Sequence, residues 1–225
     1  MVKERITSAL LTEGDADWDP RIRSQLGSFA QASANLTNFV PNTGHPLAYS
    51  PSAPGSDVSP YGNDWDVLWL GTCGVEGDVF YTYPDETVAP YNKEYQLIQS
   101  QLGAEPFGEL DRLPRERIVT NVRNALCTYT YALSLRGAIK LARISVDMDI
   151  MVDVFMSRKC GDGTLKCIAP WLAIMCDDGD KSDMGDHKHE GLREPTGGRI
   201  LQYSTRVNAE RIGEGKGMEE WKSNW

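Results

Sequence analysis

The chain has 225 residues, of which 40% are hydrophobic and 24% are charged, a composition typical of one globular domain or of one domain with a long insertion. Its formal net charge of -9 argues against a nucleic-acid partner, because contacts to phosphates need clustered lysine and arginine. No apolar run reaches the length of a membrane span, and the N-terminal residues lack the apolar core of a signal peptide. We therefore expect a soluble chain without a membrane segment.

The first informative stretch is an apolar run over residues 6–12, which predicts a short buried strand. Carboxylates follow it at alternate positions, namely Glu13, Asp15, Asp17 and Asp19. On an extended segment alternate side chains project to one side, so these four acids would share a face. Such a face either holds a hard cation such as Mg²⁺ or Mn²⁺, or Asp19 caps a helix that begins at Pro20 while the other acids are solvated.

The following elements are predicted from periodicity and from proline and glycine. Helical spacing indicates an amphipathic helix from Pro20 to about Leu36, and five prolines mark residues 40–62 as a long exposed loop. The later segments are a central strand over 64–71, a weak strand over 79–83, strands within 118–131, a helix from the N-cap Ser134 to about 143, a helix over 149–159, a strand over 165–169 closed by Pro170, and a strand or extended arm over 200–207. This order predicts an α/β domain over residues 1–184, followed by an arm and polar tail over 185–225.

The five cysteines do not follow a zinc-binding spacing. Cys160 and Cys167 flank a glycine-rich turn, and they either form a disulfide in an oxidising compartment or remain reduced thiols. Two basic residues on the helix after Ser134, Arg136 and Lys140, either face a diphosphate or point to solvent.

Several segments, in one consistent order, resemble the fungal branch of the family 25 glycosyltransferases, which are related to the lipopolysaccharide and collagen galactosyltransferases. Taken singly, each segment is a weak signal, and the ordered set covers nearly the whole chain. The segments are residues 8–11 with Asp15, Asp17 and Asp19; residues 59–71; residues 127–134 with Gly137, Ala138, Lys140 and Leu141; Asp153 with Cys160, Cys167, Pro170 and residues 182–184; and residues 199–208.

The resemblance implies a GT-A-like, Rossmann-like domain that transfers a sugar from a nucleotide-sugar donor to a hydroxyl of a glycan or protein acceptor. It implies Glu13, Asp15 and Asp17 as donor-binding residues, with Asp15 and Asp17 holding a Mn²⁺ or Mg²⁺ ion that neutralises the diphosphate leaving group. Asp153 matches an acidic residue near the acceptor, where it acts either as the base or as a charge at a helix start. Relatives carry roughly a hundred more residues upstream, so the domain is expected to lack its first strands, and relatives often act in the secretory lumen.

Departures from the family pattern leave three hypotheses open. Gly14 stands where the family has an aspartate, Thr72 stands where it has a histidine, and the stretches 117–121 and 173–176 lack further histidines that the family has there. The chain is therefore an active family 25-type transferase, a catalytically inactive or truncated relative, or a non-enzymatic module that binds sugar or metal through its acidic stretch.

Overall fold

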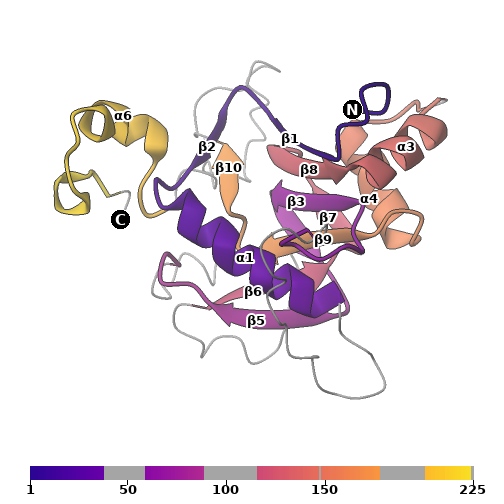
Figure 1. Cartoon of the computed structure of the whole chain (residues 1–225), viewed down its shortest axis with the longest axis horizontal. Helices are drawn as coiled ribbons and strands as arrows, with labels where there is room; N and C mark the ends of the chain where they lie inside the picture. The colour runs from indigo at the N-terminus through magenta and orange to yellow at the C-terminus, as the bar shows by residue number, and fades with distance from the viewer. Residues whose placement is uncertain (38–58, 89–115, 147, 178–200, 224–225) are drawn as a thin grey trace, which may run out of the picture.

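The computed structural model describes residues 1–37, 59–88, 116–146, 148–177 and 201–223. These residues form a mixed α/β fold around one six-stranded sheet (Figure 1). In spatial order, its strands are β1 (Ser8–Thr12), β8 (Thr130–Ser134), β3 (Val67–Gly71), β9 (Cys167–Trp171), β6 (Glu116–Asn121) and β5 (Phe80–Pro84). Only β3 and β9 are parallel neighbours; every other neighbouring pair is antiparallel. The predicted α/β class is confirmed by this mixed sheet.

Two short antiparallel pairs lie beside the main sheet. β2 (Ala16–Trp18) pairs with β10 (Met175–Asp177), and β4 (Gly74–Glu76) pairs with β7 (Asn124–Leu126). Each pair joins segments far apart in the sequence, so neither pairing has a local signal that sequence analysis can detect.

Helices cover both faces of the main sheet. α1 (Ile22–Thr37) packs over β5 and β6 on one face, and α3 (Leu135–Ile144) and α4 (Val152–Gly161) lie on the other (Figure 1). α6 (Thr205–Gly213) and a short 3₁₀ helix at Met218–Glu220 lie at one side of the molecule, next to β2. No helix among the described residues has both the length and the apolar character needed to cross a bilayer.

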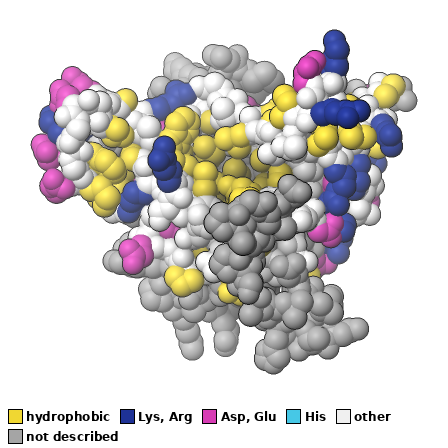
Figure 2. Space-filling model, in the orientation of Figure 1, with side chains coloured by type: hydrophobic (Ala, Val, Ile, Leu, Met, Phe, Trp, Pro, Cys, Tyr) yellow, Lys and Arg dark blue, Asp and Glu magenta, His cyan; other side chains and the backbone are white. Residues whose placement is uncertain are grey.

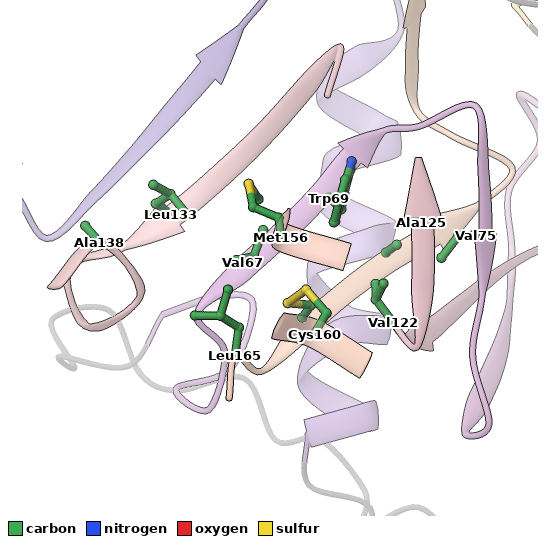
Figure 3. Close-up of a cluster of buried hydrophobic side chains, with 12 residues drawn as sticks. Val67, Trp69, Val75, Val122, Ala125, Leu133, Ala138, Met156, Cys160 and Leu165 are labelled. Carbon is green, nitrogen blue, oxygen red and sulfur yellow. A yellow bond between two sulfur atoms is a disulfide. The ribbon is translucent and has the colours of Figure 1, made fainter. Parts of the chain in front are cut away.

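The two faces of the sheet produce two hydrophobic clusters. The cluster under α1 contains Phe29, Leu68 and Ile174, all almost fully buried. The opposite cluster is centred on Trp69 of β3 and Met156 of α4 (Figure 3). Because β3 is buried on both faces, its side chains can be apolar at every position, which explains the unbroken apolar run in the sequence.

The predicted helices are confirmed close to their expected ends. α1 begins two residues after Pro20, and Asp19 accepts the backbone N–H of Arg21 at 2.9 Å, as a residue preceding a helix does. Ser134 caps α3 by accepting the backbone N–H of Gly137 at 3.0 Å. Sequence periodicity was sufficient here because each cap and each apolar stripe is local.

Three strand predictions are corrected by the structure. The segment predicted as a buried strand over residues 6–12 is β1, an edge strand whose residues are mostly exposed. Pro170 does not close the strand over 165–169 but lies inside β9, opposite Val119. The predicted arm over 200–207 becomes helical from Thr205, because Ser204 caps α6 through the backbone N–H of Val207. The proline-rich loop at 40–62 falls almost entirely outside the described residues.

Four of the five cysteines form two disulfides. Cys160 at the end of α4 is bonded to Cys167 at the start of β9, which confirms the disulfide alternative for this pair. Cys73 and Cys127, 54 residues apart, form a second disulfide that the sequence did not indicate. The fifth cysteine, Cys176, is a buried thiol. Disulfides of this kind persist mainly in oxidising compartments.

Candidate functional site

One edge of the main sheet collects the ends of strands that run in the same direction, among them β1, β3 and β9. β1 and β3 are both antiparallel to β8, and β9 is parallel to β3, so β1, β3 and β9 share one direction. Their last residues, Thr12, Gly71 and Trp171, therefore lie at one edge, which we call the carboxyl edge. Open α/β sheets bind ligands in the crevice outside the carboxyl ends of their strands. The predicted acidic stretch follows β1 directly and so starts at this edge.

The acidic stretch does not continue as an extended strand. Glu13 donates its backbone N–H to Tyr129 at 2.9 Å, and Ala16 donates back to the Glu13 carbonyl at 3.2 Å, which closes a turn over Gly14 and Asp15. This turn breaks the alternation of side chains. The prediction that Glu13, Asp15, Asp17 and Asp19 share one face is therefore wrong.

Glu13 and Asp15 remain accessible at the turn. The Glu13 side chain is exposed and accepts a hydrogen bond from the Thr128 hydroxyl at 2.8 Å, while Asp15 is partly exposed. Burial and the negative charge of Glu13 both raise the pKa of the nearby Tyr131 hydroxyl. A Cβ placed on Gly14 would meet no atom within 4 Å, so the residue between the two acids also faces open space.

Asp17 and Asp19 are buried and engaged by the C-terminal segment. Asp17 is 1% exposed and accepts hydrogen bonds from the Ser204 hydroxyl, from the backbone N–H of Arg206 at 3.3 Å and from the backbone N–H of Trp18 at 2.8 Å. Asp19 is equally buried and forms a bidentate ion pair with Arg21, with N–O distances of 2.8 and 2.6 Å. Both carboxylates therefore hold the fold together instead of facing the carboxyl edge.

A substitution at Asp17 should therefore act on stability. We expect Asp17→Ala to lower the free energy of unfolding by about 2 kcal/mol, because the Ser204 hydroxyl and the Arg206 amide lose a charged acceptor in a buried place. Hydrogen exchange should also accelerate in Thr205–Gly213. Asp15→Ala is the matched control and should leave both measurements unchanged. A stable Asp17→Ala protein with normal exchange in α6 would contradict this structural role.

Asp153 lies in the first turn of α4 and contacts two backbone amides. Its carboxylate accepts from the N–H of Val154 at 2.7 Å and from the N–H of Cys127 at 3.1 Å. A negative charge is favourable at this helix end. Because Glu13 contacts Thr128, the two acids touch adjacent residues of the segment that leads into β8. Asp153 therefore lies near Thr128, the partner of Glu13, in the folded chain. Both of its carboxylate oxygens already accept hydrogen bonds.

Two residues that were not predicted as site residues, Tyr129 and Asp177, belong to the carboxyl edge, together with a disulfide. The Tyr129 hydroxyl donates to Asp177 at 3.2 Å and lies 3.0 Å from the Cys73 sulfur. Asp177 ends β10 opposite Ala16, which places it beside the turn that carries Asp15. Tyr129 lies in the segment over 127–134 that resembles the family, and Asp177 belongs to no predicted element, and sequence analysis assigned neither of them a role at the site. The Cys73–Cys127 disulfide ties the loops after β3 and before β8 together at the same edge.

The residues at the carboxyl edge fit a metal only in part. Asp17 does not fit, because a cation would have to displace three hydrogen-bond donors in a closed environment. Glu13 and Asp15 fit better, since they are accessible and one or two carboxylates plus substrate phosphates suffice for Mg²⁺. Within the part of the chain that the structure describes, no three histidine, cysteine or acidic side chains gather closely enough to bind a metal by themselves.

Comparison with known proteins adds no relative. The chain matches no protein-family model, no curated protein and no solved structure.

Proposed function

We propose that this chain is a glycosyltransferase of the family 25 type with a GT-A-like fold, which binds a nucleotide-sugar donor at the carboxyl edge. The observation that carries the proposal is the position of the Glu13–Asp15 turn, which is accessible and directly follows β1 where β3 and β9 also end. Ligands of open α/β sheets bind at such edges. The family is proposed from the ordered sequence segments, and the mixed sheet with helices on both faces is compatible with it.

In this proposal the divalent cation would be held by Glu13 and Asp15, with Glu13 taking the place predicted for Asp17. A Mn²⁺ or Mg²⁺ ion supplies charge neutralisation for the departing diphosphate. Thr128 orients Glu13 through its 2.8 Å hydrogen bond, and the Tyr129–Asp177 pair adds a hydroxyl and a further acid beside the turn. Asp153 enters as a positioning residue that fixes the backbone at Cys127, because its two oxygens are occupied by amides.

A second candidate is a non-catalytic relative that keeps the fold but has lost donor binding. The specific observation in its favour is that Asp17, one of the two expected metal ligands, is bound to the start of α6. Gly14 also favours the non-catalytic candidate, because with glycine there the turn carries two carboxylates instead of three.

Calorimetry on the intact chain separates the two candidates. The native protein should bind UDP- or GDP-sugars only when Mn²⁺ is present, and Glu13→Gln/Asp15→Asn should weaken that binding by roughly tenfold or more, about 1.4 kcal/mol. Gly14→Asp should strengthen it, because a side chain there meets open space and adds a third charged oxygen ligand.

Gly14→Asn is the matched control for Gly14→Asp, since it has the same shape without the charge. Binding of Mn²⁺ and donor by Gly14→Asp but not by the native chain would favour the non-catalytic candidate. If neither protein binds any donor while both remain folded, the proposed function is wrong.

A further inference from the structure

β1 presents an open backbone edge. It is the last strand of the six-stranded sheet, and no described residue pairs with its outer side. The N–H of Glu13 donates to Tyr129, and the N–H of Leu135 donates to Thr7, so the odd-numbered residues of this segment bond to β8. Antiparallel ladders alternate, which leaves the N–H and C=O groups of Ser8, Leu10 and Thr12 directed outward. The strand thus carries a regular row of three residues able to pair with another strand.

The side chains along this edge are apolar and exposed. Leu10 is 53% exposed and Leu11 36%, on opposite faces of the strand, since Leu10 lies opposite Ala132 and Leu11 opposite Tyr131. Edge strands usually avoid association through charges, proline or a bulge, whereas the five residues of β1 are Ser, Ala, Leu, Leu and Thr with neither charge nor proline. Nothing in the strand itself therefore opposes pairing.

An apolar groove adjoins the same edge. It is lined by Leu10, Leu26, Leu68 and Met175, among others, where α1 leaves the sheet over β1 and β8 uncovered. Figure 2 shows hydrophobic side chains gathered in the middle of this face. The exposed apolar area thus extends from the strand edge onto the sheet, as it does at surfaces used for association.

The charges that flank β1 select an antiparallel second copy as the partner. Lys3, Glu4 and Arg5 precede the strand with a net positive charge, and Glu13 and Asp15 follow it. An antiparallel copy brings the basic end of each strand to the acidic end of the other, whereas a parallel copy would bring like charges together. The outward row Ser8, Leu10 and Thr12 is also symmetric about Leu10. A single two-fold axis at Leu10 therefore places every residue of the row opposite a residue of the other copy's row.

We propose that β1 is a homodimer interface in which two copies pair their edges antiparallel around Leu10 and join their six-stranded sheets into one continuous sheet. Ser8 of each copy lies opposite Thr12 of the other, and the two Leu10 residues face each other at the axis. The six backbone groups of each row make six hydrogen bonds across the interface, by the alternation rule. The interface does not depend on the proposed enzymatic function.

Sedimentation of the full chain tests the association. We expect a monomer–dimer equilibrium whose dimer Kd rises at least tenfold in Leu10→Lys, because two like charges then meet at the axis. Val207→Lys is the control, since Val207 on α6 is 46% exposed and lies outside the edge. Circular dichroism confirms that both variants fold. A native chain that stays monomeric at every concentration, or a Leu10→Lys protein that dimerises normally, overturns the proposal.

Disulfide trapping tests the register. Leu10→Cys should cross-link with itself under mild oxidation, because residues opposite each other in a hydrogen-bonded antiparallel pair have Cα atoms about 5.5 Å apart, within the range for a disulfide. Thr12→Cys, on the same exposed strand, should not, because the two copies of residue 12 are offset by roughly 14 Å along the strands, at about 3.4 Å per residue. Cross-linking of Thr12→Cys instead, or pairing of the edge with a foreign strand peptide while the chain stays monomeric, contradicts the proposed pairing.

Discussion

Replacing Arg117 by methionine is expected to lower the free energy of unfolding by about 3–5 kcal/mol, the loss typical of removing one partner of a buried ion pair. The side chains of Arg117 on β6 and Asp85 after β5 are 4% and 3% exposed, and the Arg117 Nε lies 2.8 Å from the Asp85 Oδ2. The same guanidinium donates to the carbonyls of Leu172 and Ala173, the latter at 2.9 Å. Methionine fills the volume but leaves a buried carboxylate and two carbonyls without these donors.

The effect of Arg117→Met should also depend on pH. Burial raises the pKa of Asp85, but the charge of Arg117 and the hydrogen bonds from Thr87 and Arg117 outweigh it, so the net pKa is lowered. A lowered pKa in the folded state stabilises the protein above the ordinary pKa of aspartate, about 3.9, and this contribution is lost as pH falls through the folded pKa. The native protein should therefore lose stability in acid more steeply than Arg117→Met does.

An exposed ion pair of similar geometry provides the control. Arg123 and Asp78 lie 2.7 Å apart, but their side chains are 48% and 51% exposed, so Arg123→Met should cost far less stability than Arg117→Met. Urea unfolding of both variants at neutral pH, together with a cycle that adds Asp85→Asn, measures the coupling between Arg117 and Asp85. Equal losses for Arg117→Met and Arg123→Met would show that burial does not decide the cost.

The elements that sequence analysis predicted well are those whose signals are local. Ser134 lies next to the helix that it caps, and the apolar stripe of α1 repeats within one segment. The exposure of β1 is not set by its local sequence. An apolar run predicts a buried strand, but whether a strand is central or at an edge depends on which strands pair with it. Its exposure could be learned only from the sheet order.

The position of the acidic stretch after a strand was predicted from the sequence, but which of its acids are accessible was not. The position of Glu13 and Asp15 after a strand is a sequence property, and the structure keeps it. The partner of Asp17 is Ser204, 187 residues away, and no spacing rule connects two such positions. The same applies to the Tyr129–Asp177 contact, which spans 48 residues. Polar contacts between distant segments therefore decide which acids are available for chemistry.

Asp66→Ala is the second substitution expected to have a large effect, with a loss of about 3 kcal/mol or more. Asp66, immediately before β3, is fully buried and accepts from Arg136 at 2.6 Å, from Lys140 at 2.6 Å and from the backbone N–H of Lys166 at 2.9 Å. One carboxylate thus joins the start of β3 to α3 and to the segment that leads into β9. Alanine removes the shared acceptor of all three.

Asp64 is the matched control for Asp66, because it binds the same Arg136 at 3.1 Å and also contacts Lys166, but is 50% exposed. Asp64→Ala should therefore cost less than about 1 kcal/mol in chemical unfolding experiments. If Asp64→Ala and Asp66→Ala lose equal stability, the ion pairs at Arg136 matter more than the burial of Asp66, which would contradict the argument.

The pH dependence of Asp66 separates its electrostatic role from simple packing. Burial raises its pKa, but the bonds from Lys140, the Lys166 amide and Arg136 lower it and outweigh burial, so the net pKa lies below the usual range. This stabilisation is present above about pH 4 and disappears as the pH falls through the folded pKa, so Asp66→Ala should flatten the acid limb of the stability curve. Arg136 and Lys140 are committed to this carboxylate at the start of β3, the end opposite Gly71 and the carboxyl edge. Lys140→Met should therefore reduce stability at neutral pH, with a smaller loss in acid, and should not change donor binding, because its charge stabilises the scaffold and not a bound diphosphate.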